Sequence, residues 1–188
     1  MRIISGKSKG KKIFDPIDIN TRPLKDLTKE SIFNIITHSN KFNTALEKSN
    51  ILDLFSGVGS FGLECLSRGS KSVTFVENYS IVLPILKKNI FNLGYQDNSS
   101  VIDKNILNQL NFKNFDTKFD IIFMDPPYKE KNLSKIIKDI FEAKIIKDNG
   151  IIIIHRHKND KDEFPKVFRI IEEKTYGISR VFFGSYTY

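Results

Sequence analysis

Cysteine, long apolar runs and an N-terminal leader are what this sequence has least of. Among 188 residues there is one cysteine, Cys65, which has no partner for an internal disulfide and fits a reducing compartment. A single thiol also argues against a cysteine-based metal site. No charge-free apolar run reaches about 18 residues, and the N-terminal MRIISGKSKGKK lacks the apolar stretch of a signal peptide. We therefore expect a cytoplasmic protein, with no membrane and no metal.

Acidic side chains are outnumbered by basic ones. The chain has 30 Lys and Arg against 22 Asp and Glu, which gives a formal charge of +8. An excess of positive charge favours a polyanionic partner, and nucleic acid is the usual one. The chain is also rich in Lys, Ile, Asn and Phe, a mixture that AT-rich codons produce, so charge alone leaves the partner open. With 40% hydrophobic residues the chain can bury the core of one domain.

From residue 50 onward, apolar runs predict strands that alternate with helices. Strands are expected over 51–55, 72–77, 99–103, 119–124 and 150–155, and helices over 61–68, 80–94, 105–110 and 133–146. Two further strand-like runs, 166–174 and 178–188, have no helix between them. The pattern predicts an α/β fold: a doubly wound, Rossmann-like, seven-stranded and mostly parallel sheet with a C-terminal antiparallel hairpin.

The first 40 residues predict a small extension before this domain. Two short arms around Gly6 and Gly10 indicate a β-hairpin, with five basic residues before the first acid, Asp15. Apolar residues between Leu27 and Ile36 then recur at helical spacing. We expect an N-terminal hairpin and helix over 1–40, and the main domain over 41–188.

A glycine-rich turn follows the first strand of the main domain. Gly57, Gly59 and Gly62 fit G-x-G-x-x-G between a strand and a helix, where backbone can approach a ligand closely. Glu77 ends the next strand and could accept the hydroxyls of a ribose. A glycine-rich strand–helix connection without a ligand fits Gly57 to Gly62 as well. With Glu77 the pattern suits either NAD or S-adenosylmethionine.

Two carboxylates distinguish those ligands. Asp53 stands just before the glycine turn, where it could take an ammonium group, which a methionine moiety has and a dinucleotide lacks. Asp125 begins the DPPY sequence directly after the strand FDIIFM, and its prolines end that strand because neither has an N–H for the ladder. The carboxyl ends of parallel strands meet at one crevice, so Asp125 is expected near the glycine turn.

These motifs resemble class I S-adenosylmethionine-dependent methyltransferases that act on exocyclic amines, whose hallmark [DNS]-P-P-[YFW] is matched by DPPY. The match narrows to the RsmD family, bacterial enzymes that methylate guanine N2 in small-subunit (16S) ribosomal RNA. It covers nearly the whole chain in order, and the N-terminal pieces are its most specific part. The similar segments are MRIISGKSKGKKI, TRPLKDLTKESIFNII, LDLFSGVGSFGLECLSRGSKSVTFVE, FDIIFMDPPY and YGISRVFFGSYTY.

The resemblance implies a role for each matching residue. Residues expected to bind S-adenosylmethionine are Asp53, Phe55, Gly57, Gly59, Glu77, Asn78, Asn105 and Ile106. Those expected to hold the guanine are Asp125 and Pro126, as acceptors for the amine, and Tyr128, as a stacking ring. Basic residues expected to contact RNA phosphates are Arg2, Lys7, Lys9, Lys11, Lys12, Arg22 and Lys25.

Two positions depart from the family pattern. His155 stands where an acid is expected at the end of the fifth strand, and with His157, Arg156 and Lys158 it is interpreted as a solvated strand-end cluster. Lys29 stands where arginine is common, which would reduce a bidentate phosphate contact to a point charge. The expected partner is small-subunit ribosomal RNA or its assembly particle. The particle is preferred because 188 residues leave little protein for reading RNA. A monomer is the default.

Three other interpretations stay open from the residues. DPPY fits a methyltransferase on another planar amine, namely adenine N6 of DNA or RNA, or a protein glutamine. The glycine turn fits an NAD-dependent dehydrogenase, although nothing after residue 110 offers a hydride-transfer site. A decayed, non-catalytic RNA-binding module is the third, and the presence of Asp53, Glu77 and DPPY together argues against it.

Overall fold

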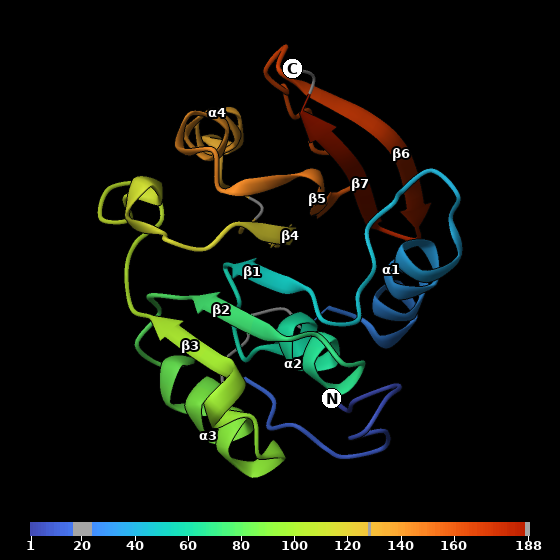
Figure 1. Cartoon of the computed structure of the whole chain (residues 1–188), viewed down its shortest axis with the longest axis vertical. Helices are drawn as coiled ribbons and strands as arrows, with labels where there is room; N and C mark the ends of the chain where they lie inside the picture. The colour runs from blue at the N-terminus through green and yellow to red at the C-terminus, as the bar shows by residue number, and fades with distance from the viewer. Residues whose placement is uncertain (17–23, 128, 187–188) are drawn as a thin grey trace.

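A computed structural model describes residues 1–16, 24–127 and 129–186, and its centre is a seven-stranded sheet. The strand order is β3-β2-β1-β4-β5-β7-β6 (Figure 1). Strands β1 to β5 pair in parallel, whereas β7 runs antiparallel to β5 and to β6. The predicted mostly parallel sheet with a C-terminal antiparallel hairpin is confirmed. The strands are β1 (Asn50–Leu54), β2 (Ser72–Val76), β3 (Ser99–Ile102), β4 (Phe119–Met124), β5 (Ile146–His157), β6 (Phe168–Tyr176) and β7 (Ser179–Tyr186).

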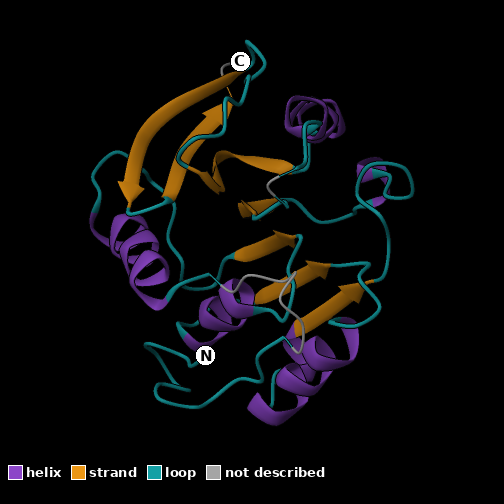
Figure 2. Cartoon of the chain, turned by 180° about the vertical axis from the view of Figure 1, so that it is seen from behind, coloured by secondary structure: helices purple, strands orange, loops and turns teal. Residues whose placement is uncertain are grey.

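Helices cover both faces of the sheet. They are α1 (Asp26–His38), α2 (Ser60–Ser67), α3 (Leu83–Leu93) and α4 (Leu133–Ala143), with short 3₁₀ turns η1 (Gln96–Asn98) and η2 (Phe112–Asn114). Successive strand residues point to opposite faces, so Ile51 packs in the cluster of α1, α2 and α3, while Leu52 packs in that of α4. Figures 1 and 2 show α1 and α4 on opposite sides of the sheet, which is therefore doubly wound, as predicted.

The predicted helix over 105–110 is wrong, because this segment is a turn. The Asn105 side chain accepts from Leu107 N at 2.9 Å, and the Gln109 side chain accepts from Asn105 N at 2.8 Å. Gln109 N and Leu110 N also donate to Asn105 O, each at 3.0 Å, so the segment closes a single turn. That turn does not continue as a helix, and the segment after β3 is a loop.

Helices α4 and α1 each differ from prediction in detail. Helix α4 ends at Ala143 because Lys144 adopts a left-handed conformation with φ of 53°, and Ile146 then begins β5. In α1, Leu27 was expected on the apolar face but is 70% exposed, whereas Ile32 and Phe33 are fully buried. The buried face of α1 therefore begins with the polar residues Thr28 and Lys29 and not with Leu27.

The N-terminal arm, residues 1–13, folds back on itself and packs on α2. Ile3 N donates to Lys11 O at 2.9 Å and Ile13 N to Met1 O at 3.1 Å, with one β-bridge between Arg2 and Lys12. The expected hairpin is thus present as a narrow antiparallel pairing. Ile3 and Ile13 belong to the same apolar cluster as residues of α2, so the arm packs on the core of the main domain. The expected domain boundary at residue 40 stays a prediction.

A buried carboxylate and a buried ammonium attach this arm to the core. Glu64 on α2 accepts from Ile4 N at 2.7 Å and from Ser5 N at 2.9 Å, and it is fully buried. Lys29 on α1 is also fully buried and donates to Arg2 O at 2.9 Å. Burial lowers the pKa of Lys29, and the Glu64 charge opposes that effect. The expected phosphate contact of Lys29 is therefore wrong, because its Nζ faces the interior.

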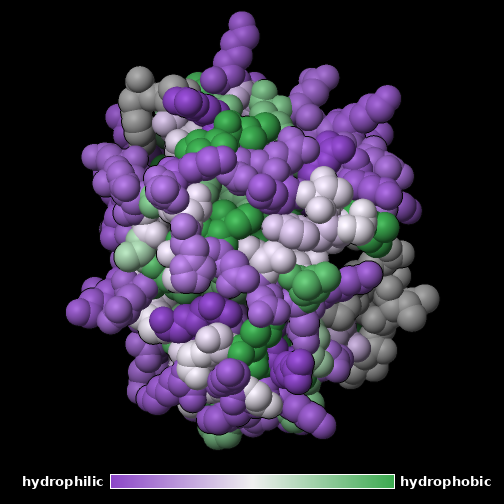
Figure 3. Space-filling model, turned by 90° about the vertical axis from the view of Figure 1, so that its right-hand side faces the viewer, coloured by the Kyte–Doolittle hydropathy of each residue, from purple (hydrophilic) through white to green (hydrophobic). Residues whose placement is uncertain are grey.

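One face of the molecule is predominantly polar (Figure 3). Figure 3 shows this face, where hydrophilic side chains cover most of the surface and hydrophobic ones gather in small patches between them. Among the residues that the structure describes, none of the helices is both long enough and apolar enough to cross a bilayer.

Two glycines of the arm give a matched test of its docking. Gly6 and Gly10 have φ of 82° and 81°, but an added Cβ would lie 1.9 Å from Ser67 O at Gly6 and meet nothing within 4 Å at Gly10. Gly10→Ala should cost about 1–2 kcal/mol for the left-handed backbone. Gly6→Ala should cost about 3 kcal/mol or more, because the arm must leave α2. Equilibrium urea unfolding measures both, and equal losses would contradict tight docking.

Candidate active site

The carboxyl ends of the five parallel strands meet around one cavity of about 1070 Å³. The side chains of Asp53, Glu77, Asn105, Asp125 and His155 line it, one from the end of each strand or from the loop after it. Strand order reverses between β1 and β4, and open parallel sheets bind ligands in the crevice at such a reversal. The cavity therefore lies where this topology favours a ligand.

Asp53 is a buried carboxylate that is only half satisfied. Its Oδ2 accepts from Gly62 N at 3.0 Å, while Oδ1 is buried without a partner among the described residues. Burial raises the pKa of Asp53 well above its usual range, the Asp125 and Glu77 charges raise it further, and the Gly62 N–H opposes them. An unpaired buried carboxylate oxygen at a cavity wall is suited to a cationic group of a ligand.

The glycine turn has a backbone conformation that would let a ligand come close to the main chain. Phe55 and Gly57 both line the cavity with positive φ, 59° and 54°, and a non-glycine residue rarely adopts this conformation. Gly59 caps the start of α2 with φ of 88°, and a Cβ there would lie 2.6 Å from Leu86 Cδ1. Gly59 is not among the cavity-lining residues, so its place in the structure is explained by packing between α2 and α3.

Glu77 is held in one orientation by backbone N–H groups. Its Oε2 accepts from Gly57 N at 2.8 Å, and its Oε1 accepts from Asn78 N and Tyr79 N, each at 2.8 Å. These bonds tie the end of β2 to the glycine turn. Asn78, Asn105 and Ile106 also line the cavity, as the sequence placed them.

The first three residues of the DPPY sequence follow β4 at the same cavity. Asp125 N donates to Leu54 O at 3.4 Å, so the turn continues the pairing of β4 with β1. Asp125, Pro126 and Pro127 line the cavity. Tyr128, the predicted stacking ring, lies outside the described residues. The structure thus brings Asp125 and Pro126 to the same cavity as Asp53 and Glu77.

The end of β5 is buried, and the prediction of a solvated cluster there is wrong for two of its members. His155 and Arg156 are only 7% and 3% exposed. Strand β5 continues past the expected end at residue 155, and His155 and Arg156 pair with Val181 and Arg180 of β7. A fifth parallel strand must also end at the crevice, and that topological signal in the sequence could have identified His155.

Both buried side chains contact the DPPY turn. His155 Nδ1 lies 2.7 Å from Asp125 Oδ1. The Arg156 guanidinium donates to Pro127 O at 3.2 Å and to Glu130 O at 3.1 Å, and it pairs with Asp162 at 3.0 Å. His155 therefore holds the Asp125 side chain, and Arg156 holds the main chain at Pro127 and at Glu130.

The basic residues expected to contact RNA lie on the surface of the N-terminal region. Those exposed are Arg2, Lys7, Lys9, Lys11, Lys12 and Lys25. Among them Lys25 also lines the cavity, together with Met1. The arm thus begins close to the cavity, and Lys25 places a positive charge at its wall. Arg22 lies outside the described residues.

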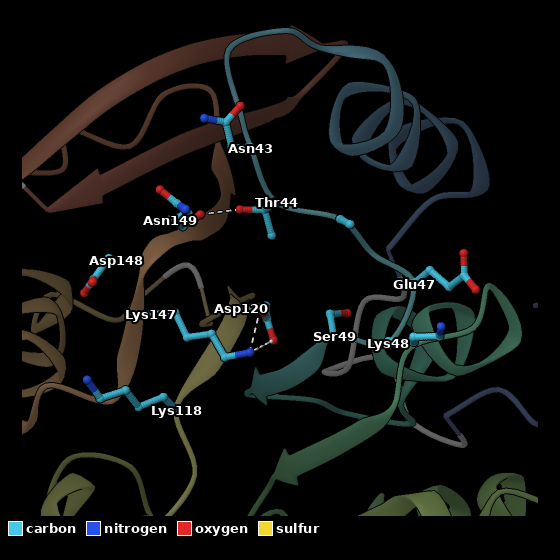
Figure 4. A pocket seen from close by; sticks show the side chains of 11 residues that line it. Asn43, Thr44, Glu47, Lys48, Ser49, Lys118, Asp120, Lys147, Asp148 and Asn149 are labelled. Carbon is cyan, nitrogen blue, oxygen red and sulfur yellow. Dashed lines mark hydrogen bonds and ion pairs between the residues drawn. The ribbon is translucent and has the colours of Figure 1, made fainter.

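A second hollow of about 530 Å³ lies at the amino-terminal ends of the parallel strands, away from the glycine turn. Figure 4 shows Lys147 beside Asp120, with Nζ 2.9 and 2.8 Å from the two carboxylate oxygens. Lys147 and Asp120 are therefore paired with each other, and the other charged residues that line this hollow are Glu47, Lys48, Lys118 and Asp148. In the part of the chain that the structure describes, no cluster of three or more His, Cys, Asp or Glu side chains could hold a metal.

Comparisons with known proteins agree with the fold. A family model described as Conserved hypothetical protein 95 matches residues 1–185. "Putative rRNA methyltransferase YlbH" of Bacillus subtilis (strain 168) is 32% identical over 183 residues, covering 96% of each protein. "Ribosomal RNA small subunit methyltransferase D" of Haemophilus influenzae is 32% identical over 179 residues, 95% of this chain and 90% of that protein. The solved structure "Putative methyltransferase yhhF from Escherichia coli" has a TM-score of 0.80 at 26% identity, covering 99% of this chain and 97% of that one.

The raised pKa of Asp53 predicts that the stability of the folded protein depends on pH. The folded protein holds the Asp53 proton more tightly than the unfolded chain does, so this group's contribution to stability falls as pH rises above the ordinary carboxyl range. Asp53→Asn should therefore raise the thermal midpoint at neutral pH and flatten its decline with pH, since the amide oxygen can still accept from Gly62 N. Asp116→Asn, at an exposed acid, is the control. Scanning calorimetry from acidic to neutral pH measures both. A thermal midpoint for Asp53→Asn below that of wild type would contradict a destabilising buried charge at Asp53.

Proposed function

We propose that this chain, which belongs to the family described as Conserved hypothetical protein 95, transfers a methyl group from S-adenosylmethionine to guanine N2 of small-subunit ribosomal RNA. The resemblance to the RsmD family is confirmed by this match and by relatives named Ribosomal RNA small subunit methyltransferase D. Those names support methylation of ribosomal RNA. The cofactor, the guanine N2 atom and the residue roles are the finer part of the proposal.

The cavity residues fit the cofactor. The unpaired Oδ1 of Asp53 would take the ammonium of its methionine part, and that contact would compensate the buried charge. The oriented carboxylate of Glu77 would face the ribose, with Asn105 and Ile106 toward the adenine. When bound, S-adenosylmethionine supplies an electrophilic methyl group on a sulfonium. A neutral cofactor without an ammonium would leave Asp53 uncompensated.

Asp125 and Pro126 would hold the acceptor amine. An exocyclic amine on a base is a poor nucleophile, because its lone pair is delocalised into the ring. Acceptors at the Asp125 carboxylate and the Pro126 carbonyl would bind its two hydrogens, which favours a pyramidal nitrogen in a fixed direction. The observation that carries the proposal is the meeting of Asp125 and the half-satisfied Asp53 at one cavity.

The N-terminal arm would contact RNA phosphates. Its lysines are exposed, and both Met1 at its start and the exposed Lys25 line the cavity. Phosphate contacts position a nucleic acid without reading its sequence. With so little protein outside the catalytic fold, we propose that an assembling small subunit supplies part of the recognition.

The first test is methyl transfer to unmodified small subunits and to protein-free small-subunit RNA, with isotopically labelled S-adenosylmethionine. Wild type should yield N2-methylguanosine, identified by mass after digestion to nucleosides, with faster turnover on particles. Asp125→Ala should lower the rate roughly a hundredfold or more while cofactor affinity is kept. Lys118→Ala, at an exposed residue beside the distant second hollow, is the control and should keep the wild-type rate.

Other products would point elsewhere. N6-methyladenosine would keep the mechanism and overturn the guanine assignment, and label in protein alone would indicate a glutamine substrate. Faster turnover on protein-free RNA would contradict the preference for particles. Failure to bind S-adenosylmethionine would remove the cofactor assignment itself.

The arm gives a separate prediction. Replacing Lys7, Lys9, Lys11 and Lys12 together by Gln should weaken RNA binding about equally for different RNA sequences. It should also reduce the slope of log K against log salt by up to about four, since each phosphate contact contributes roughly one. Filter binding over a range of salt concentrations measures this slope, and cofactor affinity serves as the internal control. An unchanged slope would place the RNA on another surface.

A further inference from the structure

We propose that His155 and Arg156, consecutive residues at the end of β5, are positioning residues for methyl transfer: they fix the Asp125 side chain and the backbone at Pro127 and Glu130. The inference rests on the proposed function and adds to it the groups that set the geometry of Asp125 and of the turn backbone. His155 acts on the Asp125 side chain, and Arg156 acts on main-chain carbonyl groups.

The register of the sheet brings His155 to Asp125. Strands β4 and β5 are parallel with Met124 opposite Ile154, so the next residue of each strand is Asp125 and His155. Their contact is 2.7 Å between Oδ1 and Nδ1. An ionised carboxylate can only accept, so this contact assigns a hydrogen to Nδ1. Oδ1 of Asp125 is then occupied, and Oδ2 is the oxygen left for an N–H of the substrate.

Burial makes this orientation rigid. The His155 side chain is 8% exposed, while that of Asp125 is 24% exposed and faces the cavity. The imidazole is confined by the sheet, so the carboxylate that it holds has one preferred rotation. A carboxylate without this contact could rotate about its terminal torsion, which is broad for aspartate.

Arg156 contacts the backbone that follows Asp125 and not its side chain. Pro126 and Pro127 have no N–H, so this stretch of backbone can be anchored only through its carbonyl groups. Arg156 supplies donors to Pro127 O and Glu130 O, which lie on both sides of residue 128. Its Nε lies 3.0 Å from each carboxylate oxygen of Asp162, which fixes the guanidinium plane. The planar fork of arginine fits this geometry, and a lysine ammonium would replace only part of it.

The two contacts should affect turnover more than cofactor binding. The predicted cofactor carboxylates, Asp53 and Glu77, belong to β1 and to the loop after β2. The hydrogen bonds that hold them come from backbone N–H groups of the glycine turn, of α2 and of the loop after β2, whereas His155 and Arg156 bond to residues that follow β4. Methyl transfer needs the amine aligned with the departing sulfur, and errors of about 1 Å can cost a hundredfold in rate.

The experiment compares two substitutions of His155. His155→Asn can place an amide N–H where Nδ1 lies, whereas His155→Leu has similar bulk and no donor. We expect His155→Leu to lower kcat roughly tenfold or more, with the Kd for S-adenosylmethionine within about twofold of wild type. His155→Asn should recover most of that loss. His157→Asn, at the half-exposed histidine two residues further along β5, is the matched control and should leave kcat unchanged.

Arg156→Lys tests the backbone contact. It should lower kcat and also leave cofactor affinity near wild type. Combining it with His155→Leu should cost less than the product of the two single losses, because both act on one turn. Calorimetric binding and thermal midpoints for every variant separate a misplaced turn from a misfolded site.

A readout without catalysis separates this inference from the proposed function. Nitrogen NMR of the His155 ring in the free protein should show the hydrogen on Nδ1, and the signal should shift in Asp125→Ala. If wild type methylates nothing while this signal behaves as expected, the proposed function fails and the contact stands. Three results would overturn the inference: unchanged kcat in His155→Leu, an Asn variant as impaired as the Leu variant, or loss of cofactor binding together with kcat.

Discussion

The parallel register of β4 between β1 and β5 is the constraint on which the site depends. It places Asp125 beside the residue after Leu54 on one side and beside His155 on the other. Groups far apart in sequence therefore meet without any long loop having to fold over them. A slip of one residue would send Asp125 to the opposite face of the sheet. The apolar faces of β4, buried on both sides, prevent that slip.

Two buried carboxylates, those of Glu64 and Asp53, differ in whether their oxygens have hydrogen-bond partners. Glu64 is fully buried, and its oxygens accept from Ile4 N, Ser5 N and Arg68 Nε, so it attaches the arm to α2. Asp53 is equally buried but has one oxygen without a partner among the described residues. The first arrangement stabilises the fold. The second costs stability, which is expected where a ligand is to supply the missing contact.

The motifs predicted which strand ends meet. Each of them marks the carboxyl end of a parallel strand: the doubly wound pattern, the glycine turn and the proline-ended strand. They did not predict the environment of Lys29 or His155. Each looked like a surface cation by residue type, and each is buried by an element distant in sequence: α2 against Lys29, and β7 against the end of β5. The turn over 105–110 was missed because its single turn, closed on Asn105 O, does not continue into a helix. Burial by distant elements is set by tertiary packing, which local periodicity does not contain.

The position of β7 between β5 and β6 has a consequence for how the protein is made. During synthesis β6 leaves the ribosome before β7, yet β6 can join the sheet only through β7. Until β7 emerges, β5 is an open edge with unpaired N–H and C=O groups, a template for pairing with other chains. An incomplete chain that has not yet exposed β7 would therefore present an aggregation-prone sheet edge.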